Sequence, residues 1–241
     1  MKPGTIYGVG LGPGDPDLMT LKAARIVQNT RHIAYFHRSD QPGHGRKIVE
    51  GMLREDVVEH GMAYPMTTEL PADDPAYVSA LAGFYECWAT RLGDLSEAGE
   101  NVAILSEGDP FFYGSFMHLY TRLRDRAPIE VVPGLPSMAA AWAASGQPMT
   151  WGEDTVAVLM GTLPEERLAD AMAGADAIVV MKVGRHIEKI KRALRQAGKF
   201  DRAVYVEHAS TGAEKVMPLV EAGDVSPYFS IVLVHGQGRR P

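Results

Sequence analysis

The 241-residue sequence contains a single cysteine, Cys87, and this scarcity excludes an intrachain disulfide and a zinc site built from cysteines. Cys87 falls in a stretch of helical apolar spacing beside Trp88, so we expect it to be a buried, inert small residue. Long hydrophobic runs are also missing. No segment approaches the roughly 20 apolar residues that span a bilayer, and the first residues show no apolar signal core. These absences favour a cytoplasmic protein without a membrane partner.

Basic residues are also fewer than acidic residues. The chain has 24 Lys and Arg residues against 30 Asp and Glu residues, which gives a formal net charge of -6 at pH 7. Such a balance repels nucleic acid over the general surface, so we expect no nucleic-acid partner. Hydrophobic residues make up 46% of the chain and charged residues 22%, which is the usual range of globular proteins. The length allows one large domain or two small ones.

Short apolar runs alternate with helical spacings through the first half of the chain. We expect strands at residues 5–9, 32–36, 57–62 and 102–105, with helices at 18–28, 46–53 and 76–97 between them. This alternation is typical of an α/β domain with a mostly parallel sheet.

Beyond residue 113 the pattern changes. We expect a helix at 114–124, a strand at 129–132, a helix of small residues at 137–145, and strands at 155–160, 177–182, 202–207, 214–220 and 228–235. No helical pattern separates the last three strands, so part of this sheet should be antiparallel. The sequence therefore predicts two α/β domains: residues 1–118 with a mostly parallel sheet and residues 119–241 with a mixed sheet.

The first expected strand leads into a glycine-rich turn, GVGLGPGDP at residues 8–16. A dinucleotide fingerprint needs the spacing G-x-G-x-x-G, but its third glycine would fall on Pro13 or Asp15. Pro13 also lacks the backbone N–H that a phosphate cradle would use. The turn therefore argues against a nucleotide-binding reductase. It lies at the carboxyl end of a strand, where open α/β sheets bind ligands, and Asp15 or Asp17 can cap the helix expected from Leu18.

Two further loops follow expected strands. The loop SEGDPFFYGS at 106–115 combines two acidic residues with glycine and proline, and VPGLPSM at 132–138 opens the helix of small residues. Small residues permit the close approach of a ligand or of another backbone segment. A capped turn without a ligand is the alternative for the loop at 106–115.

Taken together, these loops resemble the tetrapyrrole methylase family, the class III S-adenosylmethionine-dependent methyltransferases. The matching segments occur in the family's order over nearly the whole chain: GVGLGPGDPDLMTLKA at 8–23, EGDPFFYGS at 107–115, VVPGLPSMAAA at 131–141, VVMKVGR at 179–185 and VYVEHAS at 204–210. Within the family, four runs are most similar to the subgroup that methylates C-20 of precorrin-2. They are YPMTTE at 64–69, EGDPFFYGSF at 107–116, GTLPE at 161–165 and PYFSIVLVHG at 227–236.

The resemblance implies an enzyme that transfers a methyl group from S-adenosylmethionine to C-20 of precorrin-2 in cobalamin biosynthesis, giving precorrin-3A and S-adenosylhomocysteine. It also implies a homodimer of two-domain subunits with the cofactor in a cleft between the domains. Some relatives act on ribosomal RNA or on a modified histidine precursor, and the acidic charge balance argues against RNA. A cobalt-bearing substrate and another precorrin remain alternatives. An alternative of a different class is a non-catalytic tetrapyrrole- or cofactor-binding module, although the intact loops argue against it.

The resemblance also implies which residues contact the cofactor. Carried over position by position, they are Pro13, Glu107, Gly108, Asp109, Phe112, Pro136, Ser137, Met181 and Ala209. Phe112 stands where relatives often have an aliphatic residue, and Pro136 can contribute only its carbonyl or its ring. Asp109 can accept hydrogen bonds from the cofactor or offset its positive charge. No residue is identifiable as a catalytic base, because methyl transfer is a direct displacement that depends mainly on positioning.

The expected substrate carries eight carboxylates, so a local excess of positive charge should bind it. One candidate is the segment 31–47, which contains Arg31, Arg38, Arg46, Lys47 and three histidines against the single acid Asp40. The other candidate is the cluster Lys182, Arg185, His186 and Lys189. A solvated surface is the alternative for both.

Two further patterns have open interpretations. The three histidines of the first segment, His32, His37 and His44, match no familiar metal-ligand spacing, so we predict no metal site. The aromatic run Phe111-Phe112-Tyr113 either stacks on a macrocycle or packs in the core at the domain junction.

Overall fold

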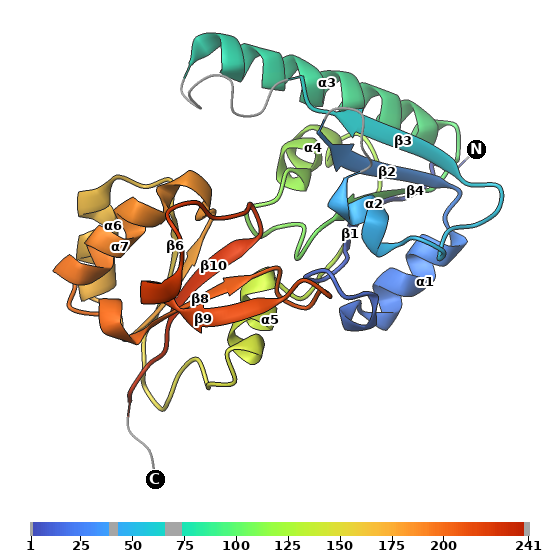
Figure 1. Ribbon diagram of the computed structural model, residues 1–241. Helices are drawn as coiled ribbons and strands as arrows, with labels where there is room; N and C mark the ends of the chain where they lie inside the picture. Colours follow the sequence, from blue (N-terminus) through green and yellow to red (C-terminus); the bar gives the residue numbers. More distant parts are fainter. Residues whose placement is uncertain (1, 39–42, 66–73, 239–241) are drawn as a thin grey trace. The chain divides into compact units, whose positions relative to one another are not determined.

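The computed structural model describes residues 2–38, 43–65 and 74–238 (Figure 1). The chain divides into two compact units, Met1–Pro136 and Ser137–Pro241, and each unit contains one five-stranded sheet. Within the described ranges, no helix has both the length and the apolar character needed to cross a bilayer.

The sheet of the first unit is parallel throughout. Its strands are β1 (Ile6–Gly10), β2 (His32–His37), β3 (Val58–Ala63), β4 (Val102–Ser106) and β5 (Ile129–Val132). Their order is β3-β2-β4-β1-β5, and every pairing is parallel. The glycine-rich turn and the two other loops singled out in the sequence follow β1, β4 and β5, which are neighbours in this order. Their carboxyl ends therefore lie along one edge of the sheet.

Helices cover both faces of this sheet (Figure 1). They are α1 (Leu21–Asn29), α2 (His44–Ile48), α3 (Pro75–Glu97) and α4 (Phe116–Leu123). Alternate strand residues face opposite sides, as the pleat requires. Ile104 packs in a cluster with residues of α3 and α4, whereas its neighbour Leu105 packs in a second cluster with residues of α1 and α2.

The structure corrects the expected start of the first helix. Asp15 accepts a hydrogen bond from the backbone N–H of Asp17 at 2.9 Å and caps only a short 3-10 turn, Pro16–Leu18. The α-helix begins at Leu21, where the Thr20 hydroxyl accepts a bond from the Ala23 N–H at 3.1 Å. Threonine is a favoured N-cap residue, so the signal was present in the sequence.

A large aromatic side chain lies directly beneath the glycine-rich turn. Phe116, the first residue of α4, is fully buried in the cluster shared by α3 and α4. A Cβ atom on Gly8 of β1 would overlap the Phe116 ring. The tip of the ring therefore packs against the backbone of the strand that leads into the turn, and only glycine fits at position 8 without a shift of the ring.

Cys87 is exposed on α3, so the expectation of a buried cysteine is wrong. The buried face of this helix is formed by Tyr85, Ala89 and Leu92 together with Gly93 and Ser96. At about 100° per residue, Cys87 points away from the direction of Tyr85 and Ala89. The beginning of α3 has a weak apolar stripe, and the sequence pattern alone did not identify the buried side.

The exposed thiol gives a direct prediction. In the native protein, Cys87 is expected to react fully with a chromogenic disulfide reagent, because the reagent needs no unfolding to reach the sulfur. Counting thiols before and after urea denaturation measures this. A thiol that reacts only after denaturation would contradict the exposure.

The second unit has a mixed sheet. Its strands are β6 (Val156–Met160), β7 (Ala177–Met181), β8 (Ala203–Glu207), β9 (Lys215–Pro218) and β10 (Ser230–Val234). Their order is β6-β7-β10-β8-β9; β6 and β7 pair in parallel and the remaining pairs are antiparallel. The antiparallel part was expected from the missing helices between the last three strands.

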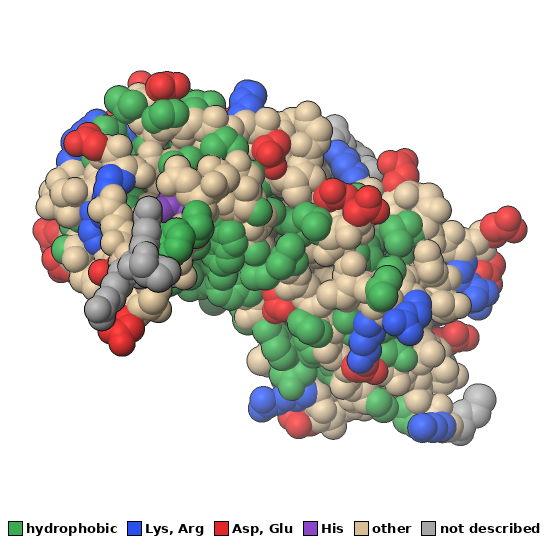
Figure 2. Space-filling model, turned by 90° about the horizontal axis from the view of Figure 1, so that it is seen from below, with side chains coloured by type: hydrophobic (Ala, Val, Ile, Leu, Met, Phe, Trp, Pro, Cys, Tyr) green, Lys and Arg blue, Asp and Glu red, His purple; other side chains and the backbone are tan. Residues whose placement is uncertain are grey.

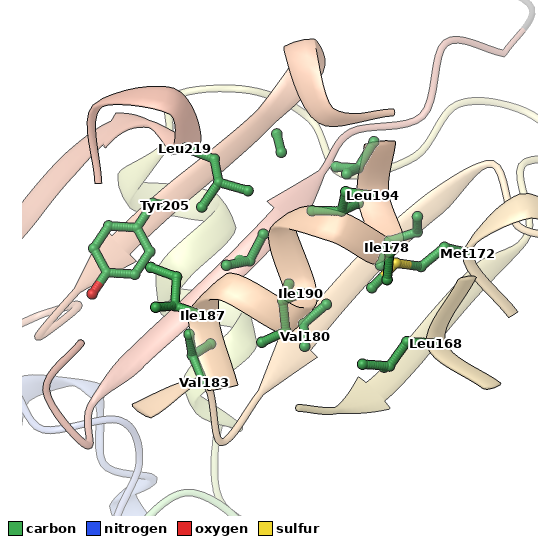
Figure 3. Packing of buried hydrophobic residues seen from close by; sticks show 14 of the residues in the cluster. Leu168, Met172, Ile178, Val180, Val183, Ile187, Ile190, Leu194, Tyr205 and Leu219 are labelled. Carbon is green, nitrogen blue, oxygen red and sulfur yellow. The ribbon is translucent and has the colours of Figure 1, made fainter. Parts of the chain in front are cut away.

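Helices α5 (Ser137–Ala144), α6 (Glu165–Ala173) and α7 (Ile187–Gln196) complete the second unit. Residues of α6 and α7 pack with one face of the sheet in the cluster shown in Figure 3. Residues of α5, including Ala141, pack with the opposite face. The fully buried Ile190 of α7 and Val180 of β7 both belong to this cluster.

The division between the units lies further along the chain than the boundary expected after residue 118. α4 packs against α3, and β5 pairs with β1, so both elements belong to the first unit. The sequence could not show this, because a helix followed by a short strand has the same pattern whichever sheet the strand joins.

Candidate functional site

The first two loops are joined by their backbones. Gly12 has a φ of 81°, a conformation that glycine adopts without cost. Its N–H donates to the carbonyl of Gly108 at 3.3 Å, and the Gly108 N–H donates back to the Gly12 carbonyl at 2.8 Å. This isolated bridge connects the turn after β1 with the loop after β4.

The third loop joins them through Gly134. The Gly134 N–H donates to Oδ2 of Asp109 at 3.1 Å, while Oδ1 of Asp109 accepts from the N–H of Phe111 at 2.8 Å. A Cβ atom on Gly134 would overlap the Gly108 carbonyl oxygen, and one on Gly10 would lie 2.5 Å from the Gly134 nitrogen. Three backbone segments therefore meet at Gly10, Gly108 and Gly134, and we call this contact the glycine junction.

Glu107 stands beside the glycine junction at the end of β4. Its Oε1 accepts a hydrogen bond from the backbone N–H of Gly45 in α2 at 3.0 Å. Desolvation by the surrounding protein raises the pKa of the Glu107 carboxyl to about 7, and the bond from Gly45 opposes the rise. The residue is nevertheless exposed to solvent, so the protein covers the carboxyl only in part. A carboxyl of this kind changes charge close to neutral pH.

The raised pKa predicts a pH-dependent stability. Between the ordinary value of 4.5 and about 7, the folded protein keeps a proton on Glu107 that the unfolded chain has lost, so wild-type stability falls as pH rises through this window. Glu107→Gln removes the titration, and we expect the variant to gain stability relative to wild type between pH 5 and pH 8. Urea denaturation at the two pH values measures the gain.

The matched control for this experiment is Glu55→Gln, which removes an exposed carboxylate elsewhere in the first unit. Its effect relative to wild type should be the same at both pH values. A Glu107→Gln variant with an equally constant effect would show that the Glu107 carboxyl titrates in its ordinary range.

The aromatic run in the second loop is partly exposed. Phe111 is 46% exposed, and its ring packs edge-on against Tyr120 with centroids 4.8 Å apart. Phe112 and Tyr113 also make an edge contact, and Tyr113 is equally exposed. Part of each ring therefore packs against the protein while another part remains available to a ligand.

Three of the expected cofactor residues lie in the second unit. Ser137 begins α5, Met181 ends β7 and Ala209 follows β8. Met181 and Ala209 pack against the same apolar cluster, which also contains Ala141 of α5. The other six expected residues lie in the first unit. Among these, Gly108 and Asp109 form part of the loop contacts described above, and Glu107 lies beside them.

Several loop residues have strained backbone conformations that the sequence did not predict. In the part of the chain that the structure describes, the non-glycine residues with positive φ are Tyr113 (55°), Lys182 (54°), His208 (48°) and Ser210 (64°). Each is next to an expected cofactor residue: Phe112, Met181 or Ala209. Such conformations are costly for residues with a Cβ and cluster at functional sites. No signal in the residue types predicted them.

Two buried hydroxyl groups add to this picture. The Oγ atoms of Ser106 and Ser210 are buried and find no hydrogen-bond partner among the described residues. Ser106 ends β4 directly before Glu107, and Ser210 follows Ala209. Buried polar groups are nearly always satisfied in proteins, so unpaired hydroxyls at these positions indicate a ligand or ordered water.

Two arginines of the first candidate basic segment pair with acids. Arg46 makes two hydrogen bonds to Glu59, at 2.6 and 3.0 Å, and Arg31 lies 3.9 Å from Asp56. His32 stacks on His60, with a distance of 3.0 Å between Nδ1 and Nε2. Asp40 of this segment, and residues 66–69 of the run YPMTTE, lie outside the described residues. Basic and acidic side chains are interspersed on the face shown in Figure 2.

Comparison with known proteins extends these observations. The family model of tetrapyrrole (corrin/porphyrin) methylases matches residues 5–222. The chain is 46% identical over 239 residues to a precorrin-2 C(20)-methyltransferase of Sinorhizobium sp., covering 99% of this chain and 98% of that protein. It is 30% identical over 239 residues to the cobalt-precorrin-2 C(20)-methyltransferase of Salmonella typhimurium, covering 97% of both.

Solved structures share the fold. The methyltransferase CobJ matches with a TM-score of 0.73 at 21% identity, covering 99% of this chain and 96% of CobJ. A uroporphyrin-III C-methyl transferase from Thermus thermophilus, solved with S-adenosyl homocysteine, matches with a TM-score of 0.68 at 25% identity, covering 96% and 97%. From the family model and the full-length relatives, the chain belongs to the tetrapyrrole (corrin/porphyrin) methylase family.

Proposed function

We propose that the protein is an S-adenosylmethionine-dependent methyltransferase that adds a methyl group to C-20 of precorrin-2, giving precorrin-3A. The observation that carries the proposal is the glycine junction, formed by three loops at the carboxyl ends of neighbouring parallel strands. Open α/β sheets bind their ligands at this edge. The substrate follows from the full-length similarity to the Sinorhizobium precorrin-2 C(20)-methyltransferase.

The residues of the loops fit S-adenosylmethionine. The glycines allow the three loop backbones to pack closely at the edge where a ligand binds, and the carboxylates of Glu107 and Asp109 lie beside them. Negative charge favours a sulfonium. We propose that the cofactor is bound by Pro13, Glu107, Gly108, Asp109, Phe112, Pro136, Ser137, Met181 and Ala209. The unpaired Ser106 and Ser210 hydroxyls are further candidates for these contacts.

The two carboxylates have different roles in this proposal. Both oxygens of Asp109 already accept backbone N–H groups, from Phe111 and Gly134, so Asp109 mainly fixes the relative positions of two loops. Oε1 of Glu107 is held by Gly45, and no described residue donates to its Oε2. Glu107 is therefore the carboxylate better able to contact the cofactor.

S-adenosylmethionine supplies an electrophilic methyl group, and precorrin-2 supplies the carbon nucleophile. The task of the chain is to align C-20, the methyl carbon and the sulfur. Orientation of this kind can contribute about 7–11 kcal/mol to lowering a barrier. Rigid loops held by backbone hydrogen bonds suit that task, and the reaction needs no covalent nucleophile from the protein.

Within this proposal, the substrate is either metal-free precorrin-2 or cobalt-precorrin-2. The Salmonella relative is a cobalt-precorrin-2 enzyme, but its identity is lower than that of the Sinorhizobium relative. Metal-free precorrin-2 is therefore the first candidate. We also propose a homodimer, as the family resemblance implies, and sedimentation velocity would measure the mass in solution.

The deciding experiment is anaerobic incubation of the purified protein with S-adenosylmethionine and either precorrin-2 or cobalt-precorrin-2, followed by mass spectrometry. One added methyl group, located at C-20 by NMR, is the expected product, and the faster substrate identifies the natural form. No added methyl group with either substrate, from protein that still binds S-adenosylmethionine, would overturn the proposed function.

A further inference from the structure

The second candidate basic cluster follows β7. Lys182 is the first residue after the strand, and Arg185 and His186 lie in a short 3-10 turn, Gly184–His186. Lys189 follows in α7. We call Lys182, Arg185 and Lys189 the β7 cation group. Lys182 and Arg185 are exposed, whereas Lys189 is partly buried.

Apolar anchors hold this segment in place. Val183, Ile187 and Ile190 alternate with the cations and are completely buried in the core of the second unit (Figure 3). The Lys189 ammonium donates to the Leu163 carbonyl at 2.6 Å, which ties the group to the loop after β6. Buried neighbours on a rigid element fix where the charged side chains start, and this reduces the entropy lost on binding.

The acids of this region are engaged by other cations. Glu165 forms an ion pair with Arg192 at 2.7 Å, and Glu188 forms one with Lys191 at 2.8 Å. Among the ion pairs between described residues, none includes Lys182, Arg185 or Lys189. Many other basic side chains of this acidic protein do pair with carboxylates, whereas these three cations form no ion pair with a described residue.

The cations also influence one another. Burial lowers the pKa of His186, and the neighbouring charges of Lys189 and Arg185 lower it further. Burial and then repulsion by Arg192 lower the pKa of Lys189, whereas Glu165 acts in the opposite direction. Glu165 therefore offsets part of the Lys189 charge, and the group keeps a net positive charge that attracts an anion.

The backbone conformation at Lys182 is strained. Its φ of 54° is unfavourable for a residue with a Cβ atom. The conformation is held from both sides of the turn: the Gly161 N–H donates to the Met181 carbonyl at 2.7 Å, and a Cβ on Gly161 would lie 2.8 Å from the Lys182 carbonyl oxygen. Strain of this kind persists where the surrounding structure enforces it, often at binding sites.

We propose that the β7 cation group binds the peripheral carboxylates of the tetrapyrrole substrate. The inference rests on the proposed function. S-adenosylmethionine carries a sulfonium, an ammonium and one carboxylate, so its net charge is positive and three cations would repel it. The macrocycle carries carboxylates around its rim, and a guanidinium can bind a carboxylate through two parallel hydrogen bonds. Lys182 also directly follows Met181, a proposed cofactor contact, so in this proposal the cations are close to the cofactor.

The test is the double variant Lys182→Gly and Arg185→Gln. Glycine suits the positive φ of position 182, so the variant is expected to unfold at no lower temperature than wild type. The KM for precorrin-2 is expected to rise by about tenfold for each charge removed, whereas the dissociation constant of S-adenosylmethionine stays within about twofold. Added salt should raise the KM of wild type more than that of the variant.

The control is Arg167→Gln, which removes an exposed positive charge from α6 in the same unit. The inference is overturned if the double variant has the same KM and salt dependence as this control. Fluorescence titration with uroporphyrin, an octacarboxylic porphyrin, separates the two proposals. If wild type fails to methylate precorrin-2, the proposed function fails, and equal uroporphyrin affinities of wild type and double variant would then overturn the β7 cation group as well.

Discussion

Replacing Gly134 with alanine is expected to destabilise the first unit by about 3 kcal/mol, the upper end of the range for overpacking, and to weaken cofactor binding. The new Cβ would overlap the carbonyl oxygen of Gly108 and approach the backbone of Gly10. These neighbours are backbone atoms of two other loops, so they cannot move aside as a flexible side chain would. The third loop must separate from the first two, and its bond to Asp109 would be lost.

Two measurements check this prediction: urea denaturation for stability, and calorimetric titration with S-adenosylmethionine for binding. An affinity loss of more than about tenfold, or 1.4 kcal/mol, is expected. Gly45→Ala is the matched control, because its Cβ would lie 3.6 Å or more from its neighbours in the same region. Wild-type affinity in Gly134→Ala would show that the junction does not form the cofactor site.

Phe116→Ala is expected to lower the free energy of unfolding by about 3–5 kcal/mol, because it removes a fully buried aromatic ring and leaves a cavity under β1. The cavity would also leave the strand before the glycine-rich turn without support. Phe111→Ala is the matched control. Because the Phe111 ring is 46% exposed, this variant should lose much less stability. Equal losses in the two variants would contradict the central position of Phe116.

A double-mutant cycle isolates the contact between the ring and β1. Gly8→Ala should be strongly destabilising in the wild-type background, because its Cβ would overlap the Phe116 ring. In the Phe116→Ala background the cavity accepts the methyl group, so the same change should cost far less. Coupling of this sort between touching residues usually falls between about 0.5 and 3 kcal/mol. Additive effects would mean that the ring does not rest on Gly8.

The strands were predictable because their apolar runs are short and bounded by turn residues. The expected strand at 129–132 coincides with β5, and that at 177–182 exceeds β7 by one residue. It was harder to predict which strands pair with one another. Strand β10 inserts between β7 and β8, and this choice depends on long-range packing that no local pattern records. The exposure of Cys87 was missed for a similar reason.

The candidate loops were identified from their glycines, prolines and acids, and the structure brings the first three loops together at one sheet edge. The sequence did not predict the raised pKa of the Glu107 carboxyl, which depends on atoms contributed by distant segments such as Gly45. Nor did it predict which basic cluster stays unpaired. Arg46 and Glu59 are 13 residues apart in sequence, and only the parallel pairing of β2 and β3 and the position of α2 bring them into contact.

The two sheets differ in when they can be completed during synthesis. Every strand of the first sheet lies between Ile6 and Val132, so this sheet can assemble while the second unit is still being translated. In the second sheet, the last strand to emerge from the ribosome, β10, occupies the central position. Until it emerges, β7 and β8 have exposed edges and no common partner. A second unit that lacks β10 therefore presents unpaired strand edges, which favour aggregation.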